Sequence, residues 1–309
     1  MELDHDVIVI GGGAAGLSAA VALARSLRSV LVIDAGEPRN APAEGVHNFL
    51  SRDGIAPRDL VEAGRAEARH YGGEIRDGRA MRAERLDDGF AVTLEDGSRV
   101  TARRLVVTTG LVDELPDIDG LREHWGRGVL HCPYCHGWEA RDQAIAVIAS
   151  SPQSVHQALL FSQLTEEITL VAHSFVPDAE QRSLLAGAGV TVLEARVQRI
   201  EASNGLILGL RLDDGSLLPA SAVVVSPRSV ARSSLLDSLG IETVVHPAGS
   251  GDFVEVDPLG QSAVPGVYLA GNVTDVAAQV MGAAAAGTRA GAAVNIDLVM
   301  TDAREKVLA

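Results

Sequence analysis

A short apolar run that leads directly into a glycine-rich turn limits the folds open to this chain. Residues 7–10 read Val-Ile-Val-Ile, residues 11–16 read Gly-Gly-Gly-Ala-Ala-Gly, and a helical pattern then continues to about residue 28. A second apolar run at 30–34 predicts another strand. A strand, a tight turn, a helix and a second strand form a βαβ unit, so the chain is expected to be an α/β protein.

The same order returns in the second half of the chain. Residues 144–149, 155–164 and 168–172 predict a strand, a helix and a strand. The turn signals Glu-Asp-Gly-Ser at 95–98 and Asp-Asp-Gly-Ser at 213–216 are each followed by a further apolar strand. The repetition indicates an internal duplication and predicts two Rossmann-like nucleotide-binding domains.

The predicted domains are interleaved along the sequence. We place the first domain at residues 1–113 and 241–309, and the second, inserted domain at 114–240. The division depends on the C-terminal segment, where a strand at 267–270 and a long helix behind it would otherwise lack a sheet. The apolar stretch at 276–300 contains Gln, Arg, Asn and Asp, so it is expected to be a buried helix and not a membrane span.

Composition and charge narrow the class of partner. Of the 309 residues, 47% are hydrophobic and 3% are aromatic, which is typical of a folded protein with an aliphatic core. The net charge of -15 argues against binding to duplex nucleic acid or to an anionic membrane, because both bind through clusters of Lys and Arg. The acidic N-terminus runs into the first strand without a signal-peptide pattern, which predicts a cytoplasmic protein.

The glycine turn predicts a dinucleotide site, because it fits G-x-G-x-x-G and lies between a strand and a helix. Gly11 would make the tight turn, Gly13 would let a pyrophosphate approach the backbone, and Gly16 would permit close helix packing. Ala14 and Ala15 begin the helix, whose N-terminus favours an anion.

Three further segments indicate which dinucleotide is bound. Asp34 ends the second strand, where its carboxylate can accept hydrogen bonds from ribose hydroxyls. Thr-Thr-Gly at 108–110 and Ala-Gly-Asn at 270–272 both end apolar strands of the same domain. Because open α/β sheets bind ligands at the carboxyl ends of their strands, these extra contacts predict FAD.

The equivalent turn of the second domain lacks this signature. Residues 149–154 read Ala-Ser-Ser-Pro-Gln-Ser, so no glycine remains, and Pro152 removes a backbone donor. No pair of arginines follows Ala172 to bind a 2′-phosphate. We expect that tight NADPH binding is lost, and a variant mode of NADPH binding stays the alternative.

The two cysteines, Cys132 and Cys135, stand at C-x-x-C spacing between His131 and His136. This spacing suits a reversible disulphide, and a neighbouring histidine can lower the pKa of a thiol or carry its proton. Haem attachment, a zinc site and a structural disulphide are the other interpretations. Haem attachment is disfavoured because an export signal is missing, and a zinc site because all of its candidate ligands would crowd into one short run. A structural disulphide is disfavoured because the loop that it would close is very short. We therefore predict a redox-active pair and no metal site.

Together these features resemble the low-molecular-weight thioredoxin reductase family over nearly all of the chain. The resemblance rests on residues 11–16, Asp34, residues 108–110, residues 132–135 and the run Gly-Val-Tyr-Leu-Ala-Gly-Asn at 266–272. It implies an FAD-binding domain and an inserted NAD(P)-binding-like domain that carries the cysteines. It also implies FAD contacts at Gly11, Gly13, Ala14, Ala15, Gly16, Asp34, Arg39, Asn40, His47, Asn48, Ala80, Thr109, Gly110, Gly271, Asn272, Gln279 and Val280.

Two positions depart from the family pattern. The family would place Asp at position 272, so Asn272 is expected to keep the hydrogen bond to the ribityl chain through a neutral amide. The family also has an acidic residue after its second cysteine, where this chain has His136.

Within the family, the sequence is most similar to the dithiol oxidases of natural-product pathways that close the disulphides of gliotoxin, holomycin and romidepsin. That resemblance implies that a small dithiol attacks the disulphide at Cys132 and leaves as an intramolecular disulphide. Cys135 would face the flavin, and His136, helped by His131, would move protons. Molecular oxygen would reoxidise the flavin and give hydrogen peroxide. The family also implies a homodimer.

Three other functions stay open. An NADPH-dependent thioredoxin or disulphide reductase would be established by NADPH turnover. A ferredoxin-driven reductase also needs no nicotinamide site, although an acidic surface does not attract an acidic ferredoxin. A flavin-bound redox sensor without enzymatic activity would turn over no dithiol.

Overall fold

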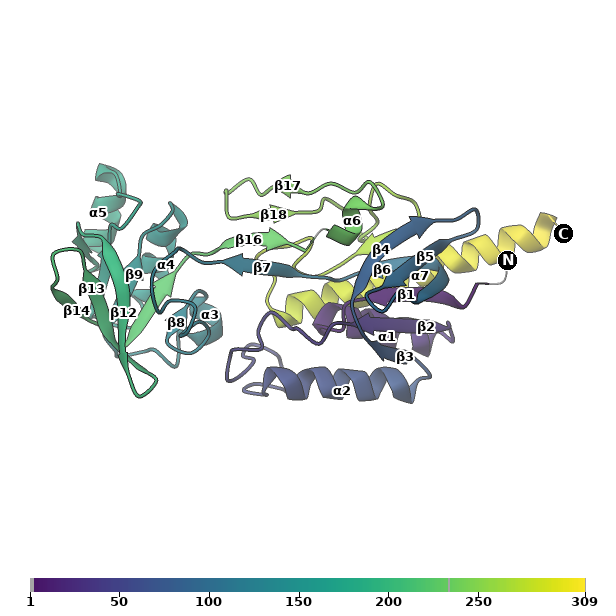
Figure 1. Ribbon diagram of the computed structural model, residues 1–309, viewed down its shortest axis with the longest axis horizontal. Helices are drawn as coiled ribbons and strands as arrows, with labels where there is room; N and C mark the ends of the chain where they lie inside the picture. The colour runs from purple at the N-terminus through teal and green to yellow at the C-terminus, as the bar shows by residue number, and fades with distance from the viewer. Residues whose placement is uncertain (1–2, 233, 309) are drawn as a thin grey trace. The chain divides into compact units, whose positions relative to one another are not determined.

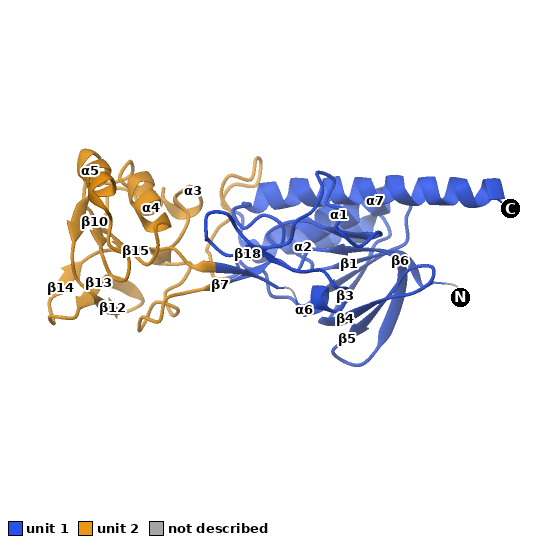
Figure 2. Ribbon diagram, turned by 90° about the horizontal axis from the view of Figure 1, so that it is seen from above, with its two compact units in different colours: residues 1–41, 55–112, 229–309 blue, residues 42–54, 113–228 orange. Residues whose placement is uncertain are grey.

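The computed structural model describes residues 3–232 and 234–308, which form two compact units. The first unit contains the residues up to 41, residues 55–112 and the residues from 229 onward, whereas the second contains 42–54 and 113–228 (Figure 2). Two paired strands, β7 (Leu111–Glu114) and β16 (Arg228–Ala231), carry the chain from one unit to the other (Figure 1).

This division differs in two places from the boundaries placed at 113 and 241 from the sequence. Residues 229–240 belong to the first unit, because the short helix α6 (Ser234–Asp237) buries Leu235 and Leu236 in the core of that unit. Residues 42–54 belong to the second unit, where Gly126 is in close contact with Pro42.

A seven-stranded sheet forms the centre of the first unit, in the order β3-β2-β1-β6-β5-β4. Strands β1, β2, β3 and β6 are parallel, while β4 and β5 continue antiparallel from the first half of β6. Strand β19 pairs in parallel with the last part of β6. Their bounds are β1 (His5–Ile10), β2 (Val30–Asp34), β3 (Glu74–Asp77), β4 (Ala80–Arg85), β5 (Phe90–Leu94), β6 (Arg99–Val107) and β19 (Val267–Leu269).

Alternation along β1 explains how this sheet is covered on both faces. Successive side chains of a strand point to opposite faces, so Val7 and Val9 pack in one core and Ile8 and Ile10 in another. The first core is closed by α1 (Ala14–Arg25) and α7 (Val280–Leu308). Helix α2 (Pro57–His70) packs beside α1, and the short hairpin β17 (Val244–Val245) and β18 (Asp252–Phe253) completes the described elements of this unit.

The second unit is built on a parallel sheet of five strands, in the order β11-β10-β9-β15-β8. Helices α4 (Gln153–Phe161) and α5 (Ala179–Gly187) bury Phe161 and Leu185 against one face, and a three-stranded sheet buries Ile200 and Leu210 against the other. The strands are β8 (Val129–Leu130), β9 (Ile145–Ile148), β10 (Ile168–Val171), β11 (Thr191–Leu193) and β15 (Ala222–Val225), with β12 (Val197–Ser203), β13 (Leu206–Leu212) and β14 (Leu217–Pro219) in the smaller sheet.

The expected α/β fold is confirmed, since β1-α1-β2 and β9-α4-β10 are two βαβ units. The two turn signals lie at hairpins, where Gly97 and Gly215 take positive φ values of 79° and 83°. The helix predicted to reach residue 28 ends at Arg25, because Leu27 adopts a φ of 61°.

The prediction of a buried helix over residues 276–300 needs correction. Helix α7 starts at Val280, extends to Leu308 and is buried along one side only, with Ile296 63% exposed. Among the described residues, no helix has the length and apolar character that a membrane crossing needs.

Candidate active site

The glycine turn is shaped by close contacts at the carboxyl ends of β1 and β6. A side-chain carbon built at Gly11 would lie 2.5 Å from the carbonyl oxygen of Thr108, and one at Gly16 would lie 1.9 Å from the carbonyl oxygen of Gly11. At Gly13 such a carbon would meet nothing within 4 Å, and the first turn of α1 has no side-chain cap. Open space therefore faces uncapped N–H groups at a helix N-terminus, an arrangement that fits a pyrophosphate.

Asp34 holds this turn in place. Its Oδ1 accepts hydrogen bonds from the backbone N–H of Gly12 at 3.2 Å and of Gly36 at 3.1 Å, and the residue is buried. Arg65 Nη1 lies 3.8 Å from Oδ2. The sequence indicates a ribose contact for this carboxylate, and the structure adds a role in ordering the glycine turn.

The segments after β6 and β19 lie at the same edge of the sheet. Thr109 Oγ1 donates to the carbonyl of Arg232 at 2.9 Å, and a side-chain carbon at Gly271 would lie 2.9 Å from the Ala15 side chain. Asn272 Nδ2 donates to the carbonyls of Asp275 and Ala278, both at 2.9 Å. The other expected cofactor residues of this unit lie in the loop after β2 (Arg39, Asn40), beside Thr109 (Gly110), at the start of α1 (Ala14), at the start of β4 (Ala80) and where α7 begins (Gln279, Val280).

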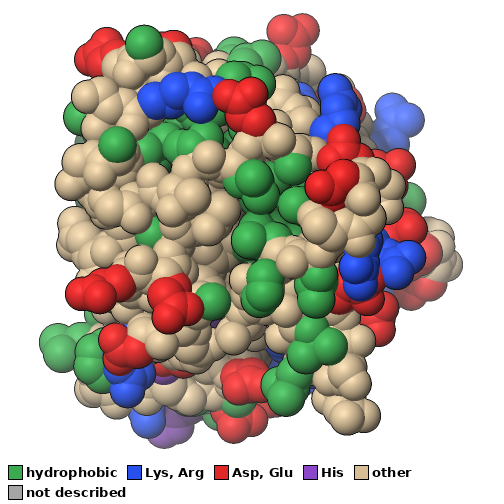
Figure 3. Space-filling model, turned by 90° about the vertical axis from the view of Figure 1, so that its left-hand side faces the viewer, with side chains coloured by type: hydrophobic (Ala, Val, Ile, Leu, Met, Phe, Trp, Pro, Cys, Tyr) green, Lys and Arg blue, Asp and Glu red, His purple; other side chains and the backbone are tan. Residues whose placement is uncertain are grey.

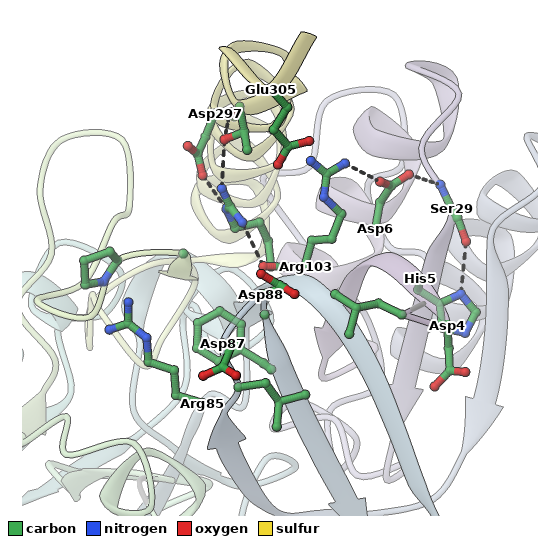
Figure 4. A pocket seen from close by; sticks show the side chains of 18 of the residues that line it. Asp4, His5, Asp6, Ser29, Arg85, Asp87, Asp88, Arg103, Asp297 and Glu305 are labelled. Carbon is green, nitrogen blue, oxygen red and sulfur yellow. Dashed lines mark hydrogen bonds and ion pairs between the residues drawn. The ribbon is translucent and has the colours of Figure 1, made fainter. Parts of the chain in front are cut away.

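A polar pocket of about 670 Å³ lies at the other end of this sheet (Figure 4). It is lined by His5, the first residue of β1, by Arg103 of β6 and by Asp297 of α7. Arg103 pairs with Asp6 at 3.2 Å, and Asp6 also accepts the backbone N–H of Ser29 at 3.0 Å. This pocket lies at the amino end of β1, and Arg103 and Arg104 in its lining are already paired with carboxylates, so we do not assign the expected ligand to it.

The two cysteines lie at the short helix α3 (Pro133–His136), which follows β8 in the second unit. The N–H groups of Cys135 and His136 both donate to the Cys132 carbonyl at 3.2 Å. Both cysteines are partly buried. One helical turn therefore separates the two residues along the backbone, a spacing that suits a reversible disulphide.

His136 has a buried ring nitrogen, Nε2, with no hydrogen-bond partner among the described residues. Burial lowers the pKa of His136, and the nearby His47 lowers it further, while Glu139 and Glu44 act in the opposite direction. The ring is therefore neutral near pH 7 and able to accept a proton.

A segment distant in sequence packs on this short helix. Asn48 Nδ2 donates to the carbonyl of Tyr134 at 2.6 Å. His47 Nε2 lies 3.6 Å from Glu139 Oε1, and its Nδ1 lies 3.3 Å from Asp53 Oδ2. The resemblance implies a flavin contact for His47 and Asn48, and in the structure these side chains make the contacts just described, within the second unit beside the cysteines.

His131, which precedes Cys132, is contacted by Gln157 of α4. The side-chain nitrogen of Gln157 lies 3.0 Å from His131 Nδ1 and 2.8 Å from the His131 carbonyl oxygen. Neither Gln157, on α4, nor Glu139, in the turn after α3, was a candidate from the sequence, because a single polar residue carries no motif signal. The fold brings Gln157 to His131, whereas Glu139 already lies four positions from Cys135 in the sequence.

Ser150, in the turn at 149–154, bonds to other parts of the chain through both of its donor groups. The backbone N–H of Ser150 donates to Ser154 Oγ at 3.2 Å, and Ser154 is fully buried. Ser150 Oγ in turn contacts the carbonyl of Ser226 at 3.4 Å. Beyond β10, His173 Nδ1 accepts the backbone N–H of Val197 at 3.0 Å. The N–H of Ser150, in the turn that would bind a nucleotide if it contained the glycines, thus bonds to the chain itself.

Aromatic side chains near the cysteines have different surroundings. Trp125 packs against the core of the second unit. Trp138 is 67% exposed, and the Arg141 guanidinium stacks 4.0 Å from the centre of its ring. On the face drawn in Figure 3, Lys and Arg side chains form no continuous patch, as the acidic composition leads one to expect.

Comparison with known proteins places this geometry in context. The model of the family described as pyridine nucleotide-disulphide oxidoreductase matches residues 5–290. A relative named thioredoxin reductase sirT, from Leptosphaeria maculans, is 30% identical over 98% of this chain and 97% of its own length. One named thioredoxin reductase tcpT, from Claviceps purpurea, is 31% identical over 86% of each chain.

Solved structures show the same similarity. The crystal structure of HlmI superposes with a TM-score of 0.92 and 42% identity, over 98% of this chain and 95% of HlmI. An oxidoreductase from Agrobacterium tumefaciens superposes with a TM-score of 0.90 and 36% identity, over 96% of this chain and 99% of that one.

Proposed function

The chain belongs to the pyridine nucleotide-disulphide oxidoreductase family, and on that premise we propose that it is an FAD-dependent dithiol oxidase that closes an intramolecular disulphide in a small natural product. Membership of the family, together with its relatives, makes the chain a thiol-disulphide oxidoreductase. The proposal adds the direction of electron flow, with a small dithiol in place of NADPH as the electron donor.

The observation that carries this direction is the turn at 149–154. A nicotinamide dinucleotide needs glycines and available N–H groups there, whereas this turn has none of the glycines and donates the N–H of Ser150 to Ser154. Pro152 removes another donor before α4 begins. These features support an electron donor that enters elsewhere, at the cysteines.

The residues of the first unit fit FAD. The turn with Gly11, Gly13 and Gly16 would hold the pyrophosphate, and Asp34 and the other residues at the carboxyl edge would hold the rest of the molecule. Bound there, FAD would supply a two-electron acceptor for the reduced cysteine pair and would be reoxidised by molecular oxygen, which becomes hydrogen peroxide.

In the exchange, one substrate thiolate attacks Sγ of Cys132, the bond between Cys132 and Cys135 breaks, and Cys135 leaves as a thiolate. The second substrate thiol then attacks the mixed disulphide, so the product disulphide forms and Cys132 is released. The substrate loses two electrons and two protons, and the cysteine pair gains the electrons. His136, with a neutral ring beside Cys135, takes up a proton.

The test follows the visible absorbance of the flavin in the purified holoprotein without oxygen. We expect dihydrolipoamide to bleach the flavin and NADPH to leave it oxidised, with one hydrogen peroxide formed per flavin when air is admitted. Cys135→Ser is the control, because it should abolish bleaching by the dithiol while the flavin stays bound. Bleaching of the variant at the wild-type rate would contradict the assignment.

A second function, NADPH-dependent reduction of thioredoxin or another disulphide, is favoured by the names of the relatives. The same experiment separates the two. Rapid bleaching by NADPH, followed by reduction of thioredoxin, would establish the reductase and overturn the oxidase.

A further inference from the structure

Gln157 is a buried residue of α4 that the exchange chemistry does not use directly. It is 5% exposed, and its Nε2 lies 2.8 Å from the His131 carbonyl oxygen, 3.0 Å from His131 Nδ1 and 3.3 Å from the Val225 carbonyl oxygen. Its Oε1 is buried without a hydrogen-bond partner among the described residues. The amide nitrogen thus has three neighbours, while the amide oxygen has none.

The two carbonyl oxygens decide which end of the Gln157 amide faces His131. A carbonyl oxygen only accepts hydrogen bonds, so the NH₂ group must point towards the oxygens of His131 and Val225. The reverse orientation would bring Oε1 against both carbonyl oxygens and would leave the NH₂ group buried without an acceptor. The NH₂ group is therefore the end that meets the imidazole.

This orientation determines the protonation state of His131. The NH₂ group has two hydrogens to share among its three neighbours and cannot accept a hydrogen bond, so a proton on Nδ1, 3.0 Å away, would have no acceptor there and Nδ1 is expected to carry a lone pair. A neutral imidazole with a lone pair on Nδ1 has its proton on Nε2. Protonation at Nδ1 would set one N–H against another in a buried place, which is unfavourable.

We propose that Gln157 is a positioning residue that keeps His131 neutral, with its proton on Nε2, so that proton uptake during thiol exchange falls to His136. Assigning the proton to His136 rests on the proposed function, whereas the tautomer of His131 does not. Through Gln157, α4 would thus contribute to the site at the cysteines. The turn that precedes α4 lacks the glycines of a nucleotide site.

Histidine tautomers are measured directly by NMR on holoprotein in which only histidine is labelled with ¹⁵N, because a protonated and an unprotonated ring nitrogen differ in shift and in coupling pattern. His131 is assigned from the signal that disappears in His131→Asn. We expect wild-type His131 to be neutral, with Nε2 protonated. A protonated Nδ1 in the wild type would overturn the proposal, whatever the variants do.

Gln157→Glu should reverse the tautomer, because a carboxylate accepts where the amide donates, and His131 should then carry a proton on Nδ1. Gln163→Glu is the matched control, since it makes the same change at an exposed position just after α4 and should leave the His131 signals unchanged. An unchanged tautomer in Gln157→Glu would contradict the proposal.

The kinetic arm measures reduction of the flavin by dihydrolipoamide in a single turnover. Gln157→Glu should be at least about tenfold slower than Gln163→Glu, because His131 with its proton on Nδ1 has a lone pair on Nε2 and would compete with His136 for the proton. Equal rates in Gln157→Glu and Gln163→Glu would contradict a positioning role for Gln157. If the wild type is bleached by NADPH and not by the dithiol, the proposed function fails, and the tautomer measured by NMR still decides the role of Gln157.

Discussion

His136 directly follows Cys135, and among the described residues its buried ring nitrogen has no hydrogen-bond partner. A substitution at His136 is therefore the most direct test of the proposed proton transfer. We predict that His136→Gln slows reduction of the flavin by the dithiol about 10²-fold or more, because a positioned proton acceptor is lost. Stopped-flow absorbance measures this rate. His156→Gln, an exposed change on α4, is the control and should react like the wild type.

The pH dependence of the same rate is a sharper test. Because burial lowers the pKa of His136, the neutral ring persists below the usual histidine value of about 6.5. Divided by the fraction of the dithiol that is thiolate at each pH, the wild-type rate should therefore stay level as the pH falls through that value and decrease only at more acid pH. A decrease centred near or above about pH 6.5 would argue against His136 as the acceptor.

Among the elements, α7 is the one whose packing reaches the dinucleotide turn. A side-chain carbon at Gly287 would lie 1.9 Å from the Ala15 carbonyl oxygen in the first turn of α1. Gly287→Ala should therefore push the two helices apart, lower the free energy of unfolding by about 1–3 kcal/mol and weaken retention of the flavin. Urea unfolding and the flavin content after gel filtration measure both effects.

Gly282 offers a matched control in the same helix. A side-chain carbon there would meet only the Ala278 side chain, at 3.8 Å, so Gly282→Ala should be neutral or raise the free energy of unfolding by up to about 1 kcal/mol. Equal stability of the two variants would show that the contact between α1 and α7 does not require glycine at 287.

For the folded chain, stability should fall on mild acidification. Burial lowers the pKa of His173, and Arg196 lowers it further, while Asp213 opposes. The unfolded chain then binds more protons, so the stabilisation is complete above about pH 6.5 and is lost as the pH falls towards the lower folded pKa. His136 shifts in the same direction and adds to this loss.

Urea midpoints at about pH 7.5 and about pH 5.5 test this prediction. His173→Gln cannot titrate and can still accept the Val197 N–H, so its midpoint should change less between the two pH values than that of the wild type. Tryptophan fluorescence follows the second unit, which contains Trp125 and Trp138, the two tryptophans of the chain. An identical change of the urea midpoint in the wild type and in His173→Gln would show that His173 does not cause the loss of stability on acidification.

Local patterns predicted much of this molecule correctly. The run at 7–16 predicts a strand, a turn and a helix from neighbouring residues alone, and β1 and α1 follow it closely. The second βαβ unit and the two hairpin turns were predicted in the same way. The resemblance to thioredoxin reductases is confirmed by the family match over residues 5–290 and by the named relatives. The identities and roles of the site residues stay predictions.

Contacts between distant segments were not predictable. The packing of residues 42–54 beside the cysteines brings Asn48 to Tyr134, which are 86 positions apart. The exposed side of α7 could not be read from its composition, because Ile296 and its buried neighbours are similarly apolar and only packing on the sheet separates them.

The sequence by itself determined the α/β class, the glycine turn and the cysteine pair, because each depends on residues within one turn or one strand of each other. The tertiary structure decided the surroundings of those residues. Gln157 reaches His131 across 26 positions, and the protonation of that ring depends on the amide and on two carbonyl oxygens that the fold brings together. A proton's place on a ring is set by distances of about 3 Å, and distances of that kind exist only once the chain has folded.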